Sequence, residues 1–247
     1  MSRARQQLPK PRRRWLRWLW ILLLTPILLS LLLVLLFRFV NPPISGVMIE
    51  RILSARSAGD QSFQIQHRWC ALSSFGPYLP VAVIASEDQR FPDHFGFDTL
   101  EMQRAIADAE EGERMRGAST ISQQVAKNLF LWSGRSWLRK GLEAWFTGLI
   151  ELSWPKRRIL ETYLNVAETG EGLFGFCDAC VVRFGKSCSK IAPYHLALLV
   201  ATLPNPRKWR ADKATPYLHR RATWIVRQMQ QLGGPQVLQQ IEGGPQK

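Results

Sequence analysis

Hydrophobic positions along the chain form one uninterrupted run and several shorter stretches with helical spacing. The run extends from Trp18 to Phe37 without a charged residue, which is the length that crosses a bilayer as a helix. Further along, apolar residues recur every three or four positions and so share one helix face. This spacing predicts helices over residues 137–154, 156–167, 193–203 and 216–232. Alternating runs typical of strands are scarce, so the sequence predicts a mainly α-helical protein.

A short apolar segment between Pro80 and Pro92 predicts another compact helix, because proline is tolerated at the start of a helix but not in its interior. Glu87 and Asp88 fall near the C-terminal end of this segment. A carboxylate there meets the negative end of the helix dipole and is poorly hydrated, so its charged form is poorly stabilised. Such a group is a candidate proton acceptor. The alternative is a solvated acidic pair at a frayed helix end.

Polar side chains gather on the next predicted helix, which begins after Thr120. The pattern Thr120-x-x-Gln123 is a capping box, and Ile121, Val125 and Leu129 form an apolar stripe. The remaining faces carry Gln123, Gln124, Lys127 and Asn128. Hydrogen-bond donors beside a helix N-terminus suit a sugar or a phosphate ligand, although an ordinary amphipathic helix would also explain the stripe.

The helix predicted over 137–154 carries an apolar seam and a charged triplet. The seam, which we expect to be buried, consists of Leu138, Leu142, Trp145, Leu149 and Leu152. Arg139, Lys140 and Glu143 lie off the seam, within one helical turn of one another. As a surface ion pair, such a triplet would stabilise the helix by only a few tenths of a kcal/mol.

The segments between these helices complete the predicted organisation. Residues 39–80 are expected to be a connector that leads into a single helical domain over 81–232. Within this domain, residues 92–118 contain three glycines, an acidic run and room for a short helix, and predict a mobile jaw beside the site. Residues 233–247 are expected to form a loose tail.

Half of the net charge of +14 lies at the N-terminus, because residues 1–17 contain seven cationic residues and no acidic one. This basic leader, residues 1–17, predicts that the N-terminus is cytoplasmic and that the chain beyond Phe39 lies outside. A cleavable signal peptide would have a shorter apolar region and a small-x-small site, which residues 38–43 do not offer. We therefore expect an uncleaved transmembrane helix over 18–38. A basic protein so placed has a membrane or anionic ligand, not nucleic acid, as its partner.

Four cysteines lie in the predicted extracytoplasmic domain, where disulfides are permitted. They are Cys70, Cys177, Cys180 and Cys188. Cys177 and Cys180 form a C-x-x-C motif, but without the context of a redox site or the second pair of a zinc site. We therefore interpret the cysteines mainly as small buried side chains.

Five motifs follow one another between residues 40 and 210. They are Glu87-Asp88-x-x-Phe91-x-x-His94-x-Gly96-x-Asp98, Gly117-x-Ser119-Thr120-Ile121-x-Gln123-Gln124-x-x-Lys127-Asn128, Arg139-Lys140-x-x-Glu143, Ile159-Leu160-Glu161-x-Tyr163-Leu164-Asn165, and Leu196-Ala197-Leu198-Leu199 running to Leu203-Pro204-Asn205-Pro206. In this order they resemble the peptidoglycan glycosyltransferases, specifically the monofunctional biosynthetic transglycosylases with one membrane helix. The segment between Gly175 and Lys186 departs from the alanine-rich helix usual in that family, which leaves room for a disulfide there.

The resemblance implies a lysozyme-like helical lobe with a small membrane-facing jaw. It also implies polymerisation of lipid II into β-1,4 glycan strands, with inversion at the anomeric carbon and release of undecaprenyl pyrophosphate. The implied location is the bacterial inner membrane, with the catalytic domain in the periplasm. The implied partners are lipid II, the growing lipid-linked glycan, the membrane and other proteins of cell wall synthesis or division.

The resemblance also assigns roles to residues. Glu87 matches the general base, and Lys127 and Arg135 match pyrophosphate-binding positions. Arg90 and Arg139 are implied supporting cations, and Ser119, Gln123 and Gln124 match positions that line the donor site. Asn128 is a further implied substrate-binding residue. Glu143 matches a second acidic residue whose role stays open between orienting the cations, holding a divalent cation such as Mg²⁺ or Mn²⁺, and assisting departure of the lipid.

Three other functions are weighed against this one. A lytic enzyme would use Glu87 as general acid on an uncharged leaving sugar and would not need the cations, which therefore favour synthesis. A non-catalytic scaffold would not need Glu87. Ser187-Cys-Ser-Lys190 matches the S-x-x-K motif of penicillin-binding transpeptidases, but no K-T-G follows it. His94 is expected to be a structural hydrogen-bond donor.

Overall fold

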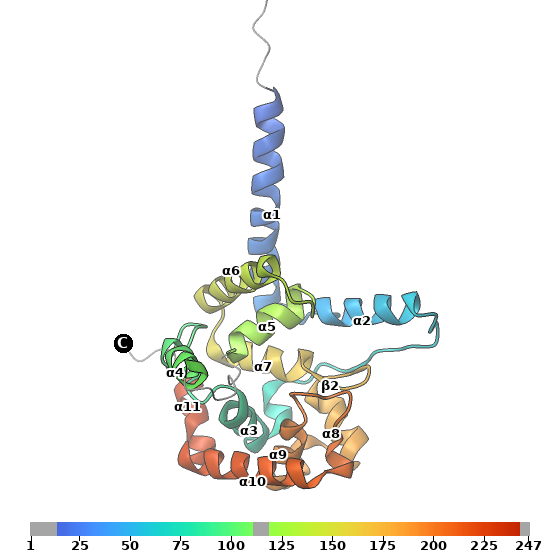
Figure 1. The fold of residues 1–247 in the computed structure, drawn as a ribbon, viewed down its shortest axis with the longest axis vertical. Coiled ribbons are helices and arrows are strands. Elements are labelled where there is room, and N and C mark those ends of the chain that lie inside the picture. Colours follow the sequence, from blue (N-terminus) through green and yellow to red (C-terminus); the bar gives the residue numbers. More distant parts are fainter. Residues whose placement is uncertain (1–13, 111–118, 243–247) are drawn as a thin grey trace, which may run out of the picture.

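Helices dominate the computed structural model, which describes residues 14–110 and 119–242 (Figure 1). They are α1 (Arg14–Phe39), α2 (Gly46–Ser57), α3 (Tyr78–Glu87), α4 (Thr99–Glu110), α5 (Ile121–Phe130), α6 (Trp137–Ser153), α7 (Lys156–Val166), α8 (Phe176–Phe184), α9 (Pro193–Ala201), α10 (Pro216–Gln231) and α11 (Val237–Glu242), with short 3-10 turns η1 (Leu72–Phe75), η2 (Cys188–Lys190), η3 (Ala211–Lys213) and η4 (Gly234–Gln236). The predicted mainly α-helical class is confirmed.

One small sheet joins segments that are far apart in the sequence. Its strands are β1 (Gln66–His67), β2 (Glu168–Gly170) and β3 (Leu173–Phe174), in the order β1-β3-β2. β1 is parallel to β3, and β2 is antiparallel to it. The sheet therefore holds the segment before α3 against the loop that follows α7.

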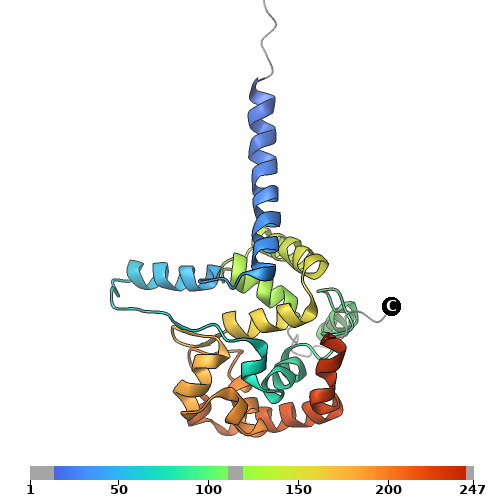
Figure 2. The same ribbon diagram turned by 180° about the vertical axis from the view of Figure 1, so that it is seen from behind.

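α1 projects from one end of the domain as a single long helix (Figure 1, Figure 2). Within residues 17–39 an 18-residue stretch has a mean hydropathy of 2.8, and among the described helices this is the one long and apolar enough to cross a membrane. Its C-terminal half packs on α6, where Trp145 Nε1 donates to Ser30 Oγ (3.1 Å) and Trp154 Nε1 donates to the carbonyl of Val34 (2.8 Å). The domain is thus docked directly onto the helix.

The segment predicted as a connector, residues 39–80, contains α2, β1 and η1 and is fixed at its start. Arg158 of α7 donates hydrogen bonds to the carbonyls of Phe37 (2.8 Å) and Val40 (2.9 Å) and to Asn41 Oδ1 (2.8 Å). These bonds cap the last carbonyls of α1, which have no partner within the helix. They also set the direction in which the chain leaves α1.

The prediction that the apolar seam of α6 is buried is wrong for most of the seam, because Leu149 packs against the core and Leu142 is half-buried but the other three residues are exposed. Leu138 and Leu152 are 71% and 86% exposed, whereas Glu143, Thr147 and Ile150 are the buried residues of α6. α6 turns this second face toward α5. Helical periodicity identifies an apolar face but does not say whether the core or a lipid phase covers it.

α3 lies in the core, and the residues from Val81 to Ala85 are all fully buried. The helix packs on α9 and α10 and begins at Tyr78, two residues earlier than predicted. Pro80 is accommodated because it lies in the first turn, where backbone N–H groups have no partner within the helix. The helix ends at Glu87, which confirms that Glu87 and Asp88 lie near its C-terminal end.

All four cysteines form disulfides, which corrects their interpretation as small buried side chains alone. Cys70 pairs with Cys177 across 107 residues, and Cys180 pairs with Cys188 across 8. Although Cys177 and Cys180 both lie on α8, each bonds to a cysteine of another segment. The C-x-x-C spacing is therefore neither a redox motif nor half of a zinc site.

Two predicted irregular segments contain helices. Residues 233–242, expected to be loose, form η4 and α11, and Val237 and Ile241 are buried in the core. In the predicted jaw, the short helix is confirmed as α4, with an ion pair between Arg104 and Glu101. The rest of the jaw, residues 111–118, and the end of the tail, residues 243–247, lie outside the described residues.

Candidate active site

Glu87 is half-buried at the end of α3 and is held by hydrogen bonds. Its Oε2 accepts from Gln124 Nε2 of α5 (3.1 Å), and its Oε1 accepts from Ser86 Oγ (3.1 Å). The Gln124 amide oxygen accepts in turn from the hydroxyl of Tyr163 in α7 (3.3 Å). Residues of α3, α5 and α7 thus fix the position of one carboxylate.

Tyr163 determines which way the Gln124 amide points. Burial raises the pKa of Tyr163 well above its usual value, and the negative charges of Glu87 and Asp88 raise it further. The phenol therefore remains protonated and acts as a donor, which requires the Gln124 oxygen to face it. The amide nitrogen is then left to face Glu87.

Asp88 links the end of α3 to the beginning of α5. Its Oδ2 accepts from the backbone N–H of Ile121 (2.9 Å), and its Oδ1 is bonded to His94 Nε2 (2.8 Å). His94 Nδ1 accepts from the backbone N–H of Gly96 (3.1 Å), so Nε2 carries the proton and donates. His94 is therefore a structural hydrogen-bond donor, as predicted.

Asp88, His94 and Asp98 form a buried cluster whose potential ligand atoms lie within 4.8 Å of one another. Both nitrogens of His94 are already used, and Asp98 Oδ1 accepts from Arg90 Nη1 (2.8 Å) and from two backbone N–H groups of α4. A divalent cation needs free oxygen or nitrogen lone pairs. The cluster does not fit one, and Arg90 is committed to an internal ion pair.

A second charged cluster surrounds Glu143, which is 3% exposed. Arg139 Nη1 pairs with its Oε2 and Lys140 Nζ with its Oε1. The interpretation as a surface ion pair is therefore wrong, because the carboxylate is buried. Since a cation already occupies each oxygen, Glu143 does not fit a metal either. Among the roles open to it, orienting the cations is the one that this arrangement favours.

Lys127 adds a third cation to this cluster. Burial lowers the pKa of Lys127, the charges of Glu143 and Glu87 oppose this shift, and Arg139 and Lys140 contribute to it. Three cations thus surround the one carboxylate of Glu143, and Arg139 Nε is buried without a partner in the described part of the chain. Such an excess of positive charge in a partly desolvated place suits a multiply charged anion.

The other predicted binding residues are placed as follows. Gln123 is buried in the predicted capping box, where its Oε1 accepts from the backbone N–H of Thr120 (3.2 Å). Ser119 and Arg135 are exposed, and Asn128 is half-buried. Gln124, Lys127 and Arg139 are therefore the predicted residues that converge with Glu87 and Glu143.

The sequence analysis did not identify two residues beside Glu87, which are Ser86 and Arg221. Arg221 of α10 donates from Nη2 to Ser86 Oγ (3.4 Å), which in turn donates to Glu87. No motif in the sequence connects α10 with α3, because the two segments are far apart along the chain. Only the packing of α10 on α3 brings Arg221 to the site.

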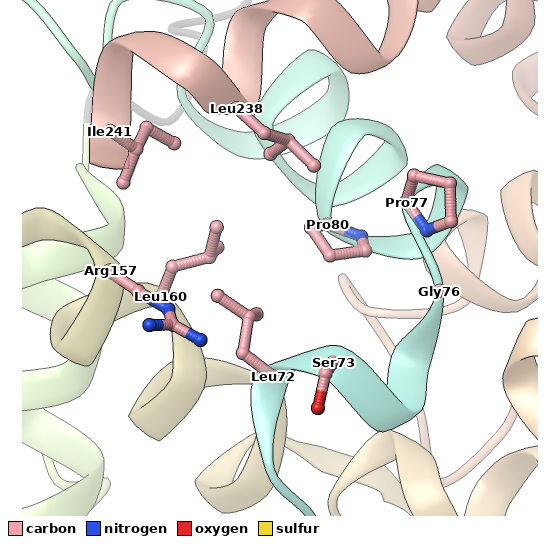
Figure 3. Close-up of a pocket in the computed structure, with 9 residues that line it drawn as sticks. All are labelled: Leu72, Ser73, Gly76, Pro77, Pro80, Arg157, Leu160, Leu238 and Ile241. Carbon is pink, nitrogen blue, oxygen red and sulfur yellow. The ribbon is translucent and has the colours of Figure 1, made fainter. Parts of the chain in front are cut away.

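An apolar pocket of about 220 Å³ lies elsewhere (Figure 3). It is bounded by Pro77 and Pro80 at the start of α3, by Leu160 of α7 and by Leu238 and Ile241 of α11. Glu87 is at the opposite end of α3. The pocket is therefore separate from the arrangement around Glu87.

A half-buried carboxylate at the end of a core helix, beside a cation cluster, defines a class of helical enzymes that act on an anionic substrate. Comparison with known proteins agrees with this class. The family model described as Transglycosylase matches residues 55–230. The chain is 51% identical over 234 residues to a biosynthetic peptidoglycan transglycosylase of Xanthomonas campestris pv. campestris (strain B100), which covers 94% of each chain.

Proteins of the same description from two other genera are equally similar. The one from Stutzerimonas stutzeri (strain A1501) is 52% identical over 221 residues, covering 90% of this chain and 91% of its own. The one from Pseudomonas putida (strain W619) is 53% identical over 213 residues, covering 86% and 90%. The chain belongs to the transglycosylase family and is a peptidoglycan glycosyltransferase with a lysozyme-like helical domain.

Proposed function

We propose that this enzyme polymerises lipid II into β-1,4 glycan strands at the bacterial inner membrane and releases undecaprenyl pyrophosphate. The observation that carries the proposal is that one helix, α5, contributes side chains both to the candidate base and to the candidate anion site. Gln124 of α5 bonds to Glu87, and Lys127, three residues later, faces the Glu143 cluster. Residues three apart lie on the same side of a helix. A substrate bound beside Glu87 can therefore place its negatively charged group against the cations around Glu143.

In this mechanism Glu87 acts as the general base. Its carboxylate takes the proton from the 4-hydroxyl of the acceptor sugar while that oxygen attacks the anomeric carbon of the donor. The hydrogen bond from Gln124 holds the carboxylate in one orientation during the transfer. Direct displacement converts an α-linked donor into a β-linked product.

The leaving group departs with the electrons of the broken bond between the anomeric carbon and the pyrophosphate. Lys127, Arg139 and Lys140 would stabilise the charge that develops on it, and exposed Arg135 stands before α6 to extend the same cluster. A pyrophosphate that is stabilised in this way needs no strong general acid.

The membrane setting is supported by three observations. α1 is long and apolar enough to span a bilayer, and the exposed seam of α6 flanks it. Two disulfides suit an oxidising compartment. The basic leader favours an N-terminus in the cytoplasm. The catalytic domain would then lie in the periplasm against the outer leaflet, where a lipid-linked substrate meets it.

The test is consumption of lipid II by the purified full chain in detergent, beside Glu87→Gln. We expect the wild type to form a polymer that muramidase digests, and Glu87→Gln to lose at least about a hundredfold in rate while keeping its melting temperature. Glu101→Gln, an exposed carboxylate of α4, is the matched control and should polymerise normally.

Two results would overturn the proposal. If Glu87→Gln still polymerises lipid II, the base is a different group. If the wild type leaves lipid II unchanged but shortens preformed glycan, the reaction is lytic, with Glu87 as general acid.

A further inference from the structure

α10 carries a polar and aromatic stripe along one flank. Tyr217, Arg221, Trp224 and Gln228 are spaced by four, three and four residues, so they share one side of the helix. The buried residues Leu218, Ala222, Ile225 and Met229 form the adjacent core face. At 1.5 Å per residue the stripe extends over about 16 Å, which we call the α10 stripe.

The α10 stripe is bonded to the residues on both sides of Glu87. Arg221 donates to Ser86 Oγ (3.4 Å), and Gln228 Oε1 accepts from Gln89 Nε2 (3.1 Å). Trp224 lies between Arg221 and Gln228 on the helix. The stripe therefore runs past the end of α3, and it approaches Glu87 from α10, whereas Gln124 approaches from α5.

The side chains of the stripe have the chemistry of a sugar-binding surface. Trp224 and Tyr217 are 43% and 45% exposed although each has a large apolar ring. An exposed aromatic ring can pack against the apolar C–H face of a pyranose, and neighbouring amide and guanidinium groups can bond its hydroxyls.

The position of α10 rules out the membrane as the occupant. α10 lies at the end of the domain remote from α1, and both views agree on this (Figure 1, Figure 2). The lipid tails of a membrane-bound substrate would be at the α1 end. The parts of such a substrate that can reach α10 are its saccharide and the peptide attached to it, and the exposed aromatic rings favour the saccharide.

We infer that the α10 stripe is a carbohydrate subsite, in which Trp224 stacks on a sugar ring of the glycan next to Glu87, and Arg221 and Gln228 bond its hydroxyls. The inference rests on the proposed function, because it extends the site of the same reaction. It assigns the residues of the α10 stripe, which lie outside the five sequence motifs, to the glycan-binding surface. The subsite would hold the glycan close to the base between successive additions.

The test measures binding without turnover. A lipid-free tetrasaccharide of alternating GlcNAc and MurNAc, with a fluorophore, is titrated into the full chain carrying Glu87→Gln in detergent, and its anisotropy is followed. We expect Trp224→Ala in this background to weaken binding about tenfold. Trp224→Phe should restore most of the affinity. Arg227→Ala, exposed on another side of α10, should bind like the parent.

A second readout uses the active chain. Trp224→Ala should shorten the glycan made from lipid II, Trp224→Phe should restore its length, and both should keep the wild-type melting temperature. The inference is overturned if Trp224→Ala binds the tetrasaccharide as tightly as its parent, or if the parent does not bind it. Those outcomes are distinct from failure of the proposed function, which the wild type would reveal by not consuming lipid II at all.

Discussion

The carboxylate of Asp88 accepts a hydrogen bond from the backbone N–H of Ile121 across 2.9 Å. Asp88 follows Glu87 directly, and Ile121 is the first residue of α5, so this bond sets the end of α3 against the beginning of α5. A carboxylate is also favourable at a helix N-terminus, where the dipole is positive. The bond therefore decides where Gln124 meets Glu87.

Asp88→Asn should destabilise the protein. Both carboxylate oxygens accept from N–H groups, of His94 and of Ile121, and an amide would turn its own NH₂ toward one of them. We expect the free energy of unfolding to fall by about 1–3 kcal/mol and the rate on lipid II to fall with it. Denaturant titration in detergent measures the first effect. Exposed Asp93→Asn is the control, and an Asp88→Asn variant as stable as this control would contradict the assignment.

The pKa of Lys127 should set the alkaline limit of activity. Burial lowers this pKa, so the ammonium is lost at a lower pH than that of an exposed lysine. Stabilisation of the leaving pyrophosphate is complete below this pKa and disappears as the pH rises through it. Lys127→Arg, which stays charged, should shift the alkaline limb of kcat/KM to higher pH, even if its absolute rate is lower. An alkaline limb that does not move would show that another group limits activity there.

Glu143→Gln should affect stability more than an ordinary surface change. It removes the charge that compensates Arg139, whose side chain is nearly buried, and we expect a loss of about 3 kcal/mol in the free energy of unfolding. Lys140→Met is the matched comparison, because the Lys140 side chain is 46% exposed and its removal should cost less than about 1 kcal/mol. Thermal melts of the two variants, run together, check the order. Equal losses would mean that Glu143 does not hold the cluster.

The two disulfides should contribute unequally to stability. Closing the loop of 107 residues between Cys70 and Cys177 removes more entropy from the unfolded chain than closing the loop of 8 between Cys180 and Cys188. In the chain-entropy treatment, replacing each pair by serine costs about 4.8 and about 2.5 kcal/mol respectively. Denaturant titration of the two double variants under non-reducing conditions measures the difference. The reverse order would show that native packing, not loop closure, governs their contribution.

Local patterns predicted much of this molecule. The helices over 137–154, 156–167, 193–203 and 216–232 follow from apolar spacing and begin where they were predicted, ending within two residues of the prediction. The capping box of Thr120 and Gln123 is confirmed. These features depend on residues within one or two helical turns of one another, so the sequence alone contains the interactions that produce them.

The candidate site was only partly predictable for the same reason. The placement of Glu87 at a helix end and the reach of Arg139 and Lys140 to Glu143 are local relationships. The burial of Glu143 is not, because it depends on which face α6 turns toward α5. The same orientation of α6 leaves most of its apolar seam outside the core.

The sequence by itself determined the long apolar helix near the N-terminus, the helical class and the candidate carboxylate and cations of the site, since each follows from composition or from short-range spacing. Tertiary structure alone decided which cysteines pair, how Asp88 and Tyr163 fix the surroundings of Glu87, and that α10 brings Arg221 to Ser86, next to Glu87. Apart from the pair of Cys180 and Cys188, these relationships join residues between 33 and 135 positions apart. Hydrophobic packing brings such segments together without leaving a periodic signal in either one.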